Sequence, residues 1–192
     1  MTLERKAVLK DLKIEKNGIS IAEVPYVGKL NVRGNAKDKD FMGNVGSVLE
    51  TLIPLEPNTK VENSKFQLIW LSPNEWLITF FKNDFFIKIH NQLSYKLNPE
   101  KTSITDISEN KTVIRIKGKK SVELLRKFMI LDIEKVLKDN SRVAQTIFVK
   151  IPILIIRNYL NEEKQSFDIH VNRSHTNYLR TLLLDGCNQF IN

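Results

Sequence analysis

Apolar residues recur along the chain at two spacings, one typical of strands and the other of helices. The stretch Leu68-Ile-Trp-Leu-Ser-Pro-Asn-Glu-Trp-Leu-Ile78 places an apolar run on each side of Ser-Pro-Asn. Pro73 fixes the backbone φ angle and Asn74 accepts turn conformations, while Leu, Ile and Trp favour a pleated surface. The stretch therefore predicts a strand, a tight turn and a second strand.

A strand followed by a glycine turn and a helix occurs twice. Residues 30–35 precede Asp38 and a helical apolar pattern, and residues 113–118 precede a second such pattern. The helical positions are Phe41, Val45, Val48, Leu49 and Leu52 in the first copy, and Val122, Leu125, Phe128 and Met129 in the second. Paired strands and another helix follow each unit, which indicates a weak internal repeat.

The remaining elements complete the two copies. The first has the tryptophan hairpin and a helix over 84–97 with Asp84 as N-cap, and residues 102–107 add a strand between the halves. The second has strands within 143–157 and over 167–171, and a terminal helix with Ser174 as N-cap and Tyr178, Leu179, Leu182 and Leu183 on one face. We predict one α+β domain over 1–192, with two related, tightly packed lobes, about 20–108 and 109–192, and mainly antiparallel sheets.

Composition narrows the class of protein. The chain has 192 residues, of which 42% are hydrophobic and 27% charged, enough for a substantial core. No apolar run approaches the roughly 20 residues that span a bilayer. The single cysteine, Cys187, excludes an internal disulfide and a multi-cysteine metal site. We expect a cytoplasmic protein with no membrane partner.

The formal charge of +8 raises the possibility of nucleic-acid binding. Lysines are spread along the whole chain and alternate with acidic residues, and the densest run, Lys117-Gly-Lys-Lys120, is short and opens a helix. We therefore expect a dispersed basic surface with no nucleic-acid partner. An acidic protein partner would also explain part of the charge.

Reactive groups do not gather in the sequence. There is no G-x-G-x-x-G, Walker or G-x-S-x-G motif, and the three histidines, His90, His170 and His175, lack metal-ligand spacing. Cys187 has no neighbouring histidine to activate it. We expect no catalytic, cofactor or metal residue on this chain.

Three positions, Asp106, Trp70 and Trp76, each leave two alternatives open. Asp106, with Glu109 nearby, is either an acid in a cleft or a turn residue, since Asp-x-Ser suits turn hydrogen bonds. Trp70 and Trp76 either stack on a planar ligand or fill a core or an interface. Arg33-Gly34 is expected to end a strand, where glycine accepts a backbone conformation that a side chain would penalise.

The hairpin sequence Trp-Leu-Ser-Pro-Asn-Glu-Trp resembles the W-L-G-P-D-E-W-L signature of the gamma subunit of heterotetrameric sarcosine oxidase. Ser72 and Asn74 replace the Gly and Asp of the signature. Weaker blocks lie in the family order at 33–34, 105–108, 113–118, 144–146 and 171–174. The positions that match, and that the resemblance places in the core or at subunit contacts, are Arg33, Gly34, Trp70, Pro73, Glu75, Trp76, Asp106, Ser108, Arg173 and Ser174.

The resemblance implies a fold similar to the folate-binding domains of the glycine-cleavage T-protein. It also implies a non-catalytic gamma chain in a complex with alpha, beta and delta subunits that oxidises sarcosine to glycine and passes the one-carbon unit to tetrahydrofolate. FAD, FMN, NAD, zinc and tetrahydrofolate are expected on the partner subunits. The alternative is a free-standing folate-binding or one-carbon transfer module that uses Asp106.

Overall fold

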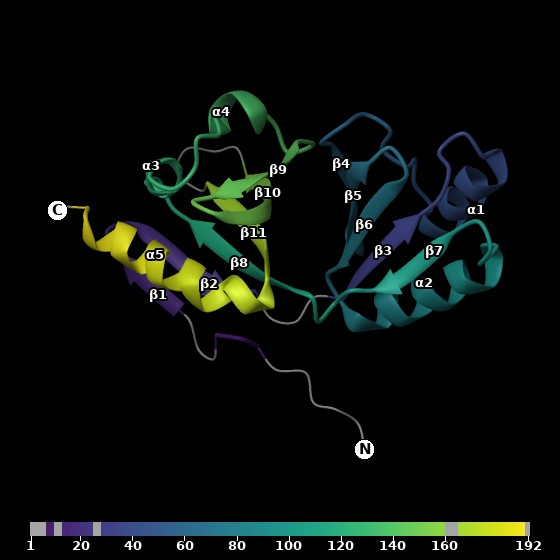
Figure 1. Cartoon of the computed structure of the whole chain (residues 1–192), viewed down its shortest axis with the longest axis horizontal. Coiled ribbons are helices and arrows are strands. Elements are labelled where there is room, and N and C mark those ends of the chain that lie inside the picture. Colours follow the sequence, from purple (N-terminus) through teal and green to yellow (C-terminus); the bar gives the residue numbers. More distant parts are fainter. Residues whose placement is uncertain (1–6, 10–12, 25–27, 160–164, 191–192) are drawn as a thin grey trace, which may run out of the picture. The chain divides into compact units, whose positions relative to one another are not determined.

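The computed structural model describes residues 7–9, 13–24, 28–159 and 165–190. The chain divides into two compact units, one of residues 27–108 and the other of residues 1–26 together with 109–192. Each unit has its own antiparallel sheet and its own hydrophobic core (Figure 1). The predicted α+β class with antiparallel sheets is confirmed. Within the described residues, no helix is long and apolar enough to cross a membrane.

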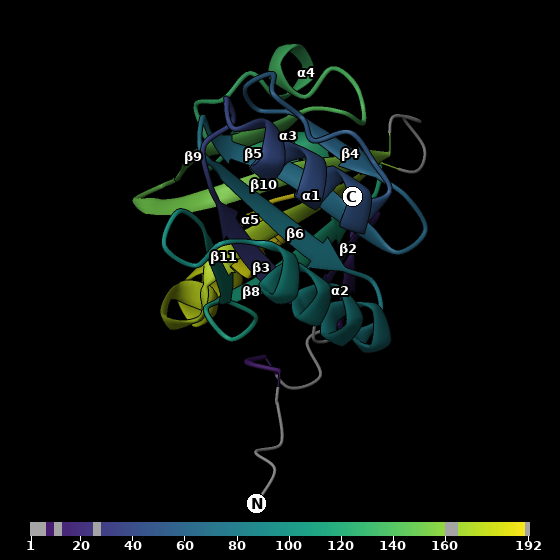
Figure 2. The same ribbon diagram turned by 90° about the vertical axis from the view of Figure 1, so that its right-hand side faces the viewer.

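The unit of residues 27–108 has a five-stranded sheet in the order β4-β5-β6-β3-β7. Two helices, α1 and α2, lie over one face of it (Figure 2). In chain order the elements are β3 (Lys29–Arg33), α1 (Lys39–Leu49), β4 (Lys60–Glu62), β5 (Phe66–Ser72), β6 (Glu75–Phe80), α2 (Asn83–Lys96) and β7 (Ser103–Asp106). Without the edge strand β4, this is the β-α-β-β-α-β arrangement of ferredoxin-like folds.

Helix α1 begins and ends for local reasons. The Asp38 carboxylate accepts hydrogen bonds from the backbone N–H groups of Asp40 and Phe41, which caps the first turn. Glu50 adopts a left-handed conformation with φ of 53° and ends the helix. Leu52 therefore lies beyond α1 and is 87% exposed. Its predicted place on the buried face of the helix is wrong.

Helix α2 also departs from its prediction at one end. Its N-cap is Lys82, which makes no side-chain cap hydrogen bond, and Asp84 lies within the first turn. The prediction of Asp84 as N-cap is wrong, although its charge still suits the positive end of the helix dipole. The strand predicted over 102–107 is present as β7.

The second unit has a six-stranded sheet in the order β1-β2-β8-β11-β10-β9. Its helices α3 and α5 pack against one face. In chain order the elements are β1 (Lys13–Lys16), β2 (Ile19–Glu23), β8 (Lys111–Lys117), α3 (Ser121–Arg126), α4 (Ile133–Val136), β9 (Val143–Phe148), β10 (Ile151–Tyr159), β11 (Ser166–Asn172), the 3-10 turn η2 (Arg173–His175) and α5 (Thr176–Asn188).

The predicted repeat is present in the topology. The order β4-β5-β6-β3 in one sheet matches β9-β10-β11-β8 in the other, and all these pairs are antiparallel. The next position is filled by β7 in the first unit and by the N-terminal strand β2 in the second. The N-terminal strands therefore belong with the C-terminal half of the chain.

Alternation along β8 divides the second sheet into two faces. Ile114 and Ile116 lie in the core with Leu124 of α3 and Leu179 of α5. Arg115, which lies between them, and Lys117, which follows them, point to the opposite face, because successive strand side chains alternate. This opposite face carries the polar side chains that form the hollow described below.

Candidate functional site

The hairpin that carries the two tryptophans forms as predicted. Pro73 and Asn74 join β5 to β6, and Trp70 lies directly opposite Trp76 across the pair. The Ser72 hydroxyl donates to the side-chain oxygen of Asn74 over 2.9 Å. The two residues that depart from the family signature thus bond to each other and close the turn.

Trp76 is a core residue, with 1% of its surface exposed. Its indole N–H donates to the carbonyl oxygen of Pro54 over 2.8 Å, and its ring centroid lies 5.7 Å from that of Phe41. Trp70 is partly buried against the same core. Because Trp76 is enclosed, it serves the packing of this unit and has no ring face available to stack on a ligand.

Arg33 and Glu75 face each other across the β3–β6 pair. The Arg33 guanidinium lies 3.5 Å from one carboxylate oxygen of Glu75, and the Asn31 amide donates to the other over 2.6 Å. Both oxygens of Glu75 therefore have a partner. Arg33 also lines a hollow of about 500 Å³ together with Gly34, Asn74 and Lys101.

Gly34 is required for packing. Its N–H donates to the carbonyl oxygen of Asn74 over 3.1 Å, which joins it to the hairpin turn. Its φ is not positive, and a Cβ at this position would lie 2.4 Å from the Phe41 ring. The expectation that glycine is needed here for its backbone freedom is wrong, because close approach of an aromatic ring is the reason.

Asp106 and Ser108 form a hydrogen-bonded turn at the end of β7. One Asp106 oxygen accepts from the Ser108 backbone N–H over 2.9 Å and from the Ser108 hydroxyl over 2.5 Å. The Ser108 hydroxyl also accepts from the Lys29 backbone N–H over 2.8 Å. Of the two alternatives for Asp106, this geometry favours the turn residue over the acid in a cleft.

Arg173 and Ser174 lie in the other unit, at the start of the last helix. The Arg173 guanidinium lies 2.9 Å from a carboxylate oxygen of Glu109. Ser174 lies in the 3-10 turn η2, and α5 begins at Thr176 with His175 as N-cap. The prediction of Ser174 as N-cap is wrong. The family-motif residues are therefore divided between the two units, with all but these two in residues 27–108.

Cys187 is fully buried in α5, and burial raises the pKa of its thiol. Lys127 and Lys16 partly offset this rise by their charges. Within the part of the chain that the structure describes, no group of three or more His, Cys, Asp or Glu side chains could hold a metal ion.

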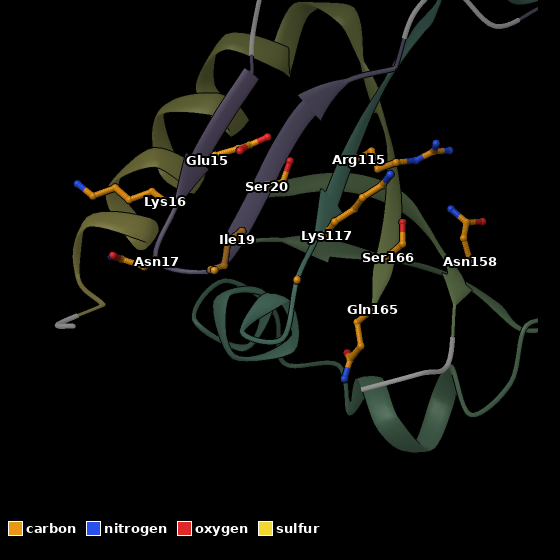
Figure 3. Close-up of a pocket in the computed structure, with 12 residues that line it drawn as sticks. Glu15, Lys16, Asn17, Ile19, Ser20, Arg115, Lys117, Asn158, Gln165 and Ser166 are labelled. Atoms are coloured by element: carbon orange, nitrogen blue, oxygen red, sulfur yellow. The ribbon is translucent and has the colours of Figure 1, made fainter. Parts of the chain in front are cut away.

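A hollow of about 810 Å³ opens on the sheet face of the second unit that the helices leave uncovered. It was not expected from the sequence. Figure 3 shows side chains from β1, β2, β8, β10 and β11 around it. Its lining comprises Glu15, Lys16, Asn17, Gly18, Ile19, Ser20, Arg115, Lys117, Gly118, Asn158, Gln165 and Ser166.

Two glycines shape one end of this hollow. Asn17 and Gly18 have φ of 52° and 75°, the positive values of a two-residue hairpin turn between β1 and β2. Gly118 has φ of 123°, and a Cβ there would lie 2.0 Å from the Gly18 carbonyl oxygen. Asn-Gly between apolar alternating residues is a strong hairpin signal, and it could have located this turn from the sequence.

An ion pair supports the middle of the same face. Arg115 donates to both carboxylate oxygens of Asp168, over 2.6 and 2.7 Å, from opposite positions on β8 and β11. The hydrogen bond and the charge of Asp168 raise the pKa of Arg115, against the lowering effect of burial. The guanidinium is therefore fixed in place and stays charged.

Comparison with known protein families assigns the sequence to one of them. The model of the sarcosine oxidase gamma subunit family matches residues 33–189. A search of curated proteins found no match.

A solved structure shares the fold. A chain of heterotetrameric sarcosine oxidase from Corynebacterium sp. U-96, in complex with pyrrole 2-carboxylate, superimposes with a TM-score of 0.81 and 22% identity, over 92% of this chain and 87% of that one. The regulatory subunit of aspartate kinase from Thermus flavus reaches a TM-score of only 0.45 with 11% identity, over 89% of this chain and 97% of that one, a similarity too weak to indicate a shared fold. Because the family model matches most of the sequence, the chain belongs to the sarcosine oxidase gamma subunit family.

Proposed function

We propose that this chain is the non-catalytic gamma subunit of a cytoplasmic heterotetrameric complex of the sarcosine oxidase type. Alpha, beta and delta subunits are its partners. The complex oxidatively demethylates sarcosine to glycine with oxygen, releases hydrogen peroxide and passes the one-carbon unit to tetrahydrofolate. The observation that carries the proposal is the family match over residues 33–189.

The contacts of the motif residues support a structural role for the chain. The buried Trp76 donates a hydrogen bond to Pro54. Glu75 pairs with Arg33 and accepts a hydrogen bond from Asn31, and Asp106 accepts hydrogen bonds from Ser108 in a turn. Each of these polar groups already has a partner within its own unit. We accordingly assign FAD, FMN, NAD, zinc and tetrahydrofolate to the partner subunits.

Affinity purification of the tagged chain from its native host tests the proposal. The eluate is examined for flavin absorbance and for sarcosine-dependent peroxide, and its subunits are identified by mass spectrometry. Co-elution of flavin-bearing large subunits with this activity is the expected result. A lone chain without flavin would contradict the proposal and favour the free-standing folate-binding module, which predicts micromolar binding of folate by the isolated chain.

A further inference from the structure

We propose that the 810 Å³ hollow of the second unit binds a small organic molecule through an oxyanion, a carboxylate or a phosphate ester, at Lys117. Ser20 and Ser166 supply hydroxyl donors on either side of the ammonium group. This inference goes beyond the subunit role proposed above, because it assigns the chain a ligand of its own.

Lys117 is the cation of the hollow that has no side-chain partner among the described residues. Lys16 turns away and donates to the Asn188 side chain over 2.7 Å, and Arg115 is paired with Asp168. Glu15, the acidic residue of the lining, lies 3.2 Å from Lys13. Among the described residues, none forms an ion pair or a side-chain hydrogen bond with Lys117, which is exposed. An anion in the hollow would therefore meet a net positive charge.

The strand register places two hydroxyl groups beside Lys117. Ser20 of β2 and Ser166 of β11 are both directly opposite Lys117 on β8. Directly opposite residues have Cβ atoms about 4.5–5.5 Å apart and point to the same face. Within the described parts of the chain, neither hydroxyl has a hydrogen-bond partner. One ammonium and two hydroxyls on three neighbouring strands can surround an oxyanion.

The side chain of Arg115 borders the site on the same strand as Lys117. Arg115 and Lys117 lie two residues apart on β8, and both extend along the same face over β11 (Figure 3). Asp168 holds Arg115 through two hydrogen bonds, so the guanidinium stands fixed beside the site. Because the Asp168 carboxylate balances the charge of Arg115, the positive charge of this row that a ligand can meet is that of Lys117. Gln165 points away from Lys117 and is no part of this site (Figure 3).

A bulge in β10 brings a further polar group to the rim. The pairing of β10 with β11 shifts between Arg157 and Tyr159, so that Asn158 is the extra residue opposite Ser166. Bulges of this kind redirect side chains and are frequent beside functional sites. Asn158 accordingly joins the lining of the hollow.

The size of the hollow indicates a ligand larger than an inorganic ion. Its volume of about 810 Å³ lies within the range of small-molecule sites, roughly 300–1,000 Å³. Ile19 and the backbone of Gly18 and Gly118 contribute non-ionic lining next to the charged row. We therefore expect a molecule with one oxyanion at Lys117 and an uncharged body over the glycines.

Titration of the full chain with sodium phosphate and, separately, with sodium acetate tests the site. The ¹H–¹⁵N spectrum is recorded at constant ionic strength, so that screening does not change. We expect saturable shifts centred on Ser20, Lys117 and Ser166. Saturation by phosphate alone identifies a phosphate ester, and saturation by acetate alone identifies a carboxylate. Shifts that rise linearly, or that are spread over the whole basic surface, would overturn the proposal.

Variants distinguish binding at this site from nonspecific attraction to the positive charge of the protein. Lys117→Gln should weaken binding by about tenfold or more, and Ser166→Ala by roughly three- to tenfold, as expected for losing a charged and a neutral donor. Lys150→Gln removes the same charge from an exposed turn of this unit and should leave binding unchanged. Equal losses for the two lysine variants would refute the site.

The same measurement can be made on the assembled protein. Equilibrium dialysis of the purified complex with radiolabelled phosphate or acetate, with wild-type or Lys117→Gln chain, gives the same comparison. Binding that is identical in the two complexes would contradict the site while leaving the subunit role intact. Failure of the complex to form would contradict the subunit role and leave the titration of the free chain as the test of the site.

Discussion

The indole N–H of Trp76 donates to the carbonyl oxygen of Pro54 across 2.8 Å, and both residues are buried. The bond fixes the segment after α1 to the strand β6, 22 residues further along the chain. The second tryptophan of the hairpin signature thus joins the loop that follows the helix to the sheet beneath it.

Replacing Trp76 by Phe should lower the free energy of unfolding by about 1–3 kcal/mol, because the buried Pro54 oxygen loses its donor. Trp70→Phe is the matched control. Trp70 is only partly buried and belongs to the same hairpin, so its replacement should cost less. Urea unfolding of the isolated chain gives both values, and an equal or larger loss for Trp70→Phe would contradict this account.

Gly34→Ala should destabilise the unit of residues 27–108 by about 1–3 kcal/mol, the usual cost of overpacking. The added methyl group would lie 2.4 Å from the Phe41 ring. The double variant Gly34→Ala with Phe41→Leu should recover part of the stability lost to this overlap.

Gly43 provides the control for that experiment. A Cβ at Gly43 meets no atom within 4 Å, and the residue lies inside α1. Gly43→Ala should therefore stabilise the chain by about 0.5–1 kcal/mol through helix propensity. If Gly34→Ala were as benign in urea unfolding, the packing explanation for Gly34 would be refuted.

Asp168→Asn should cost more stability than Glu109→Gln. Asp168 is 8% exposed in its side chain and accepts two hydrogen bonds from Arg115, whereas Glu109 is 49% exposed in its pair with Arg173. We expect about 1–3 kcal/mol for the first change and about 0–1 kcal/mol for the second. Chemical denaturation of both variants in the same buffer measures the two losses of unfolding free energy. A larger loss for Glu109→Gln than for Asp168→Asn would disprove this prediction.

Cys187 should resist alkylation by iodoacetamide while the chain is folded and react when urea unfolds it. The thiol is buried, and burial raises its pKa, so both access and thiolate formation are suppressed. Mass spectrometry of the single-cysteine chain follows the reaction. Labelling of the folded chain at the rate of the unfolded chain would contradict this placement.

The raised pKa of Cys187 also has a consequence for stability. As the pH rises through the ordinary value for a thiol, the unfolded chain loses this proton before the folded chain does. The contribution of this group to the free energy of unfolding should therefore fall with increasing pH in that window. Cys187→Ala should lack this contribution, and an unchanged pH profile would show that the thiol does not titrate differently on folding.

Elements with strong local patterns were predictable. The hairpin around Pro73 follows from apolar runs on each side of a turn, and the repeated strand, glycine turn and helix follows from the switch in apolar spacing. The ends of the helices were harder to predict from the sequence. Asp84 and Ser174 are good capping residues, but the N-cap of α2 lies two residues earlier, at Lys82, and the chain enters α5 through a 3-10 turn.

The hollow could not be assembled from sequence patterns. Ser20, Lys117 and Ser166 become neighbours only because β2 and β11 both pair with β8, and these pairings join segments about 50 to 100 residues apart. The Asn17-Gly18 turn was a local signal for the N-terminal hairpin. Its packing beside Gly118 was not, because it depends on the close approach of two backbone segments.

The most direct test of the central claim is to purify the complex from a host in which this chain has been deleted and to measure its assembly and its sarcosine-dependent peroxide production. A structural gamma subunit predicts a complex that fails to assemble or loses stability, with both restored when the wild-type chain is supplied. A complex that keeps full activity and full stability without this chain would contradict the account.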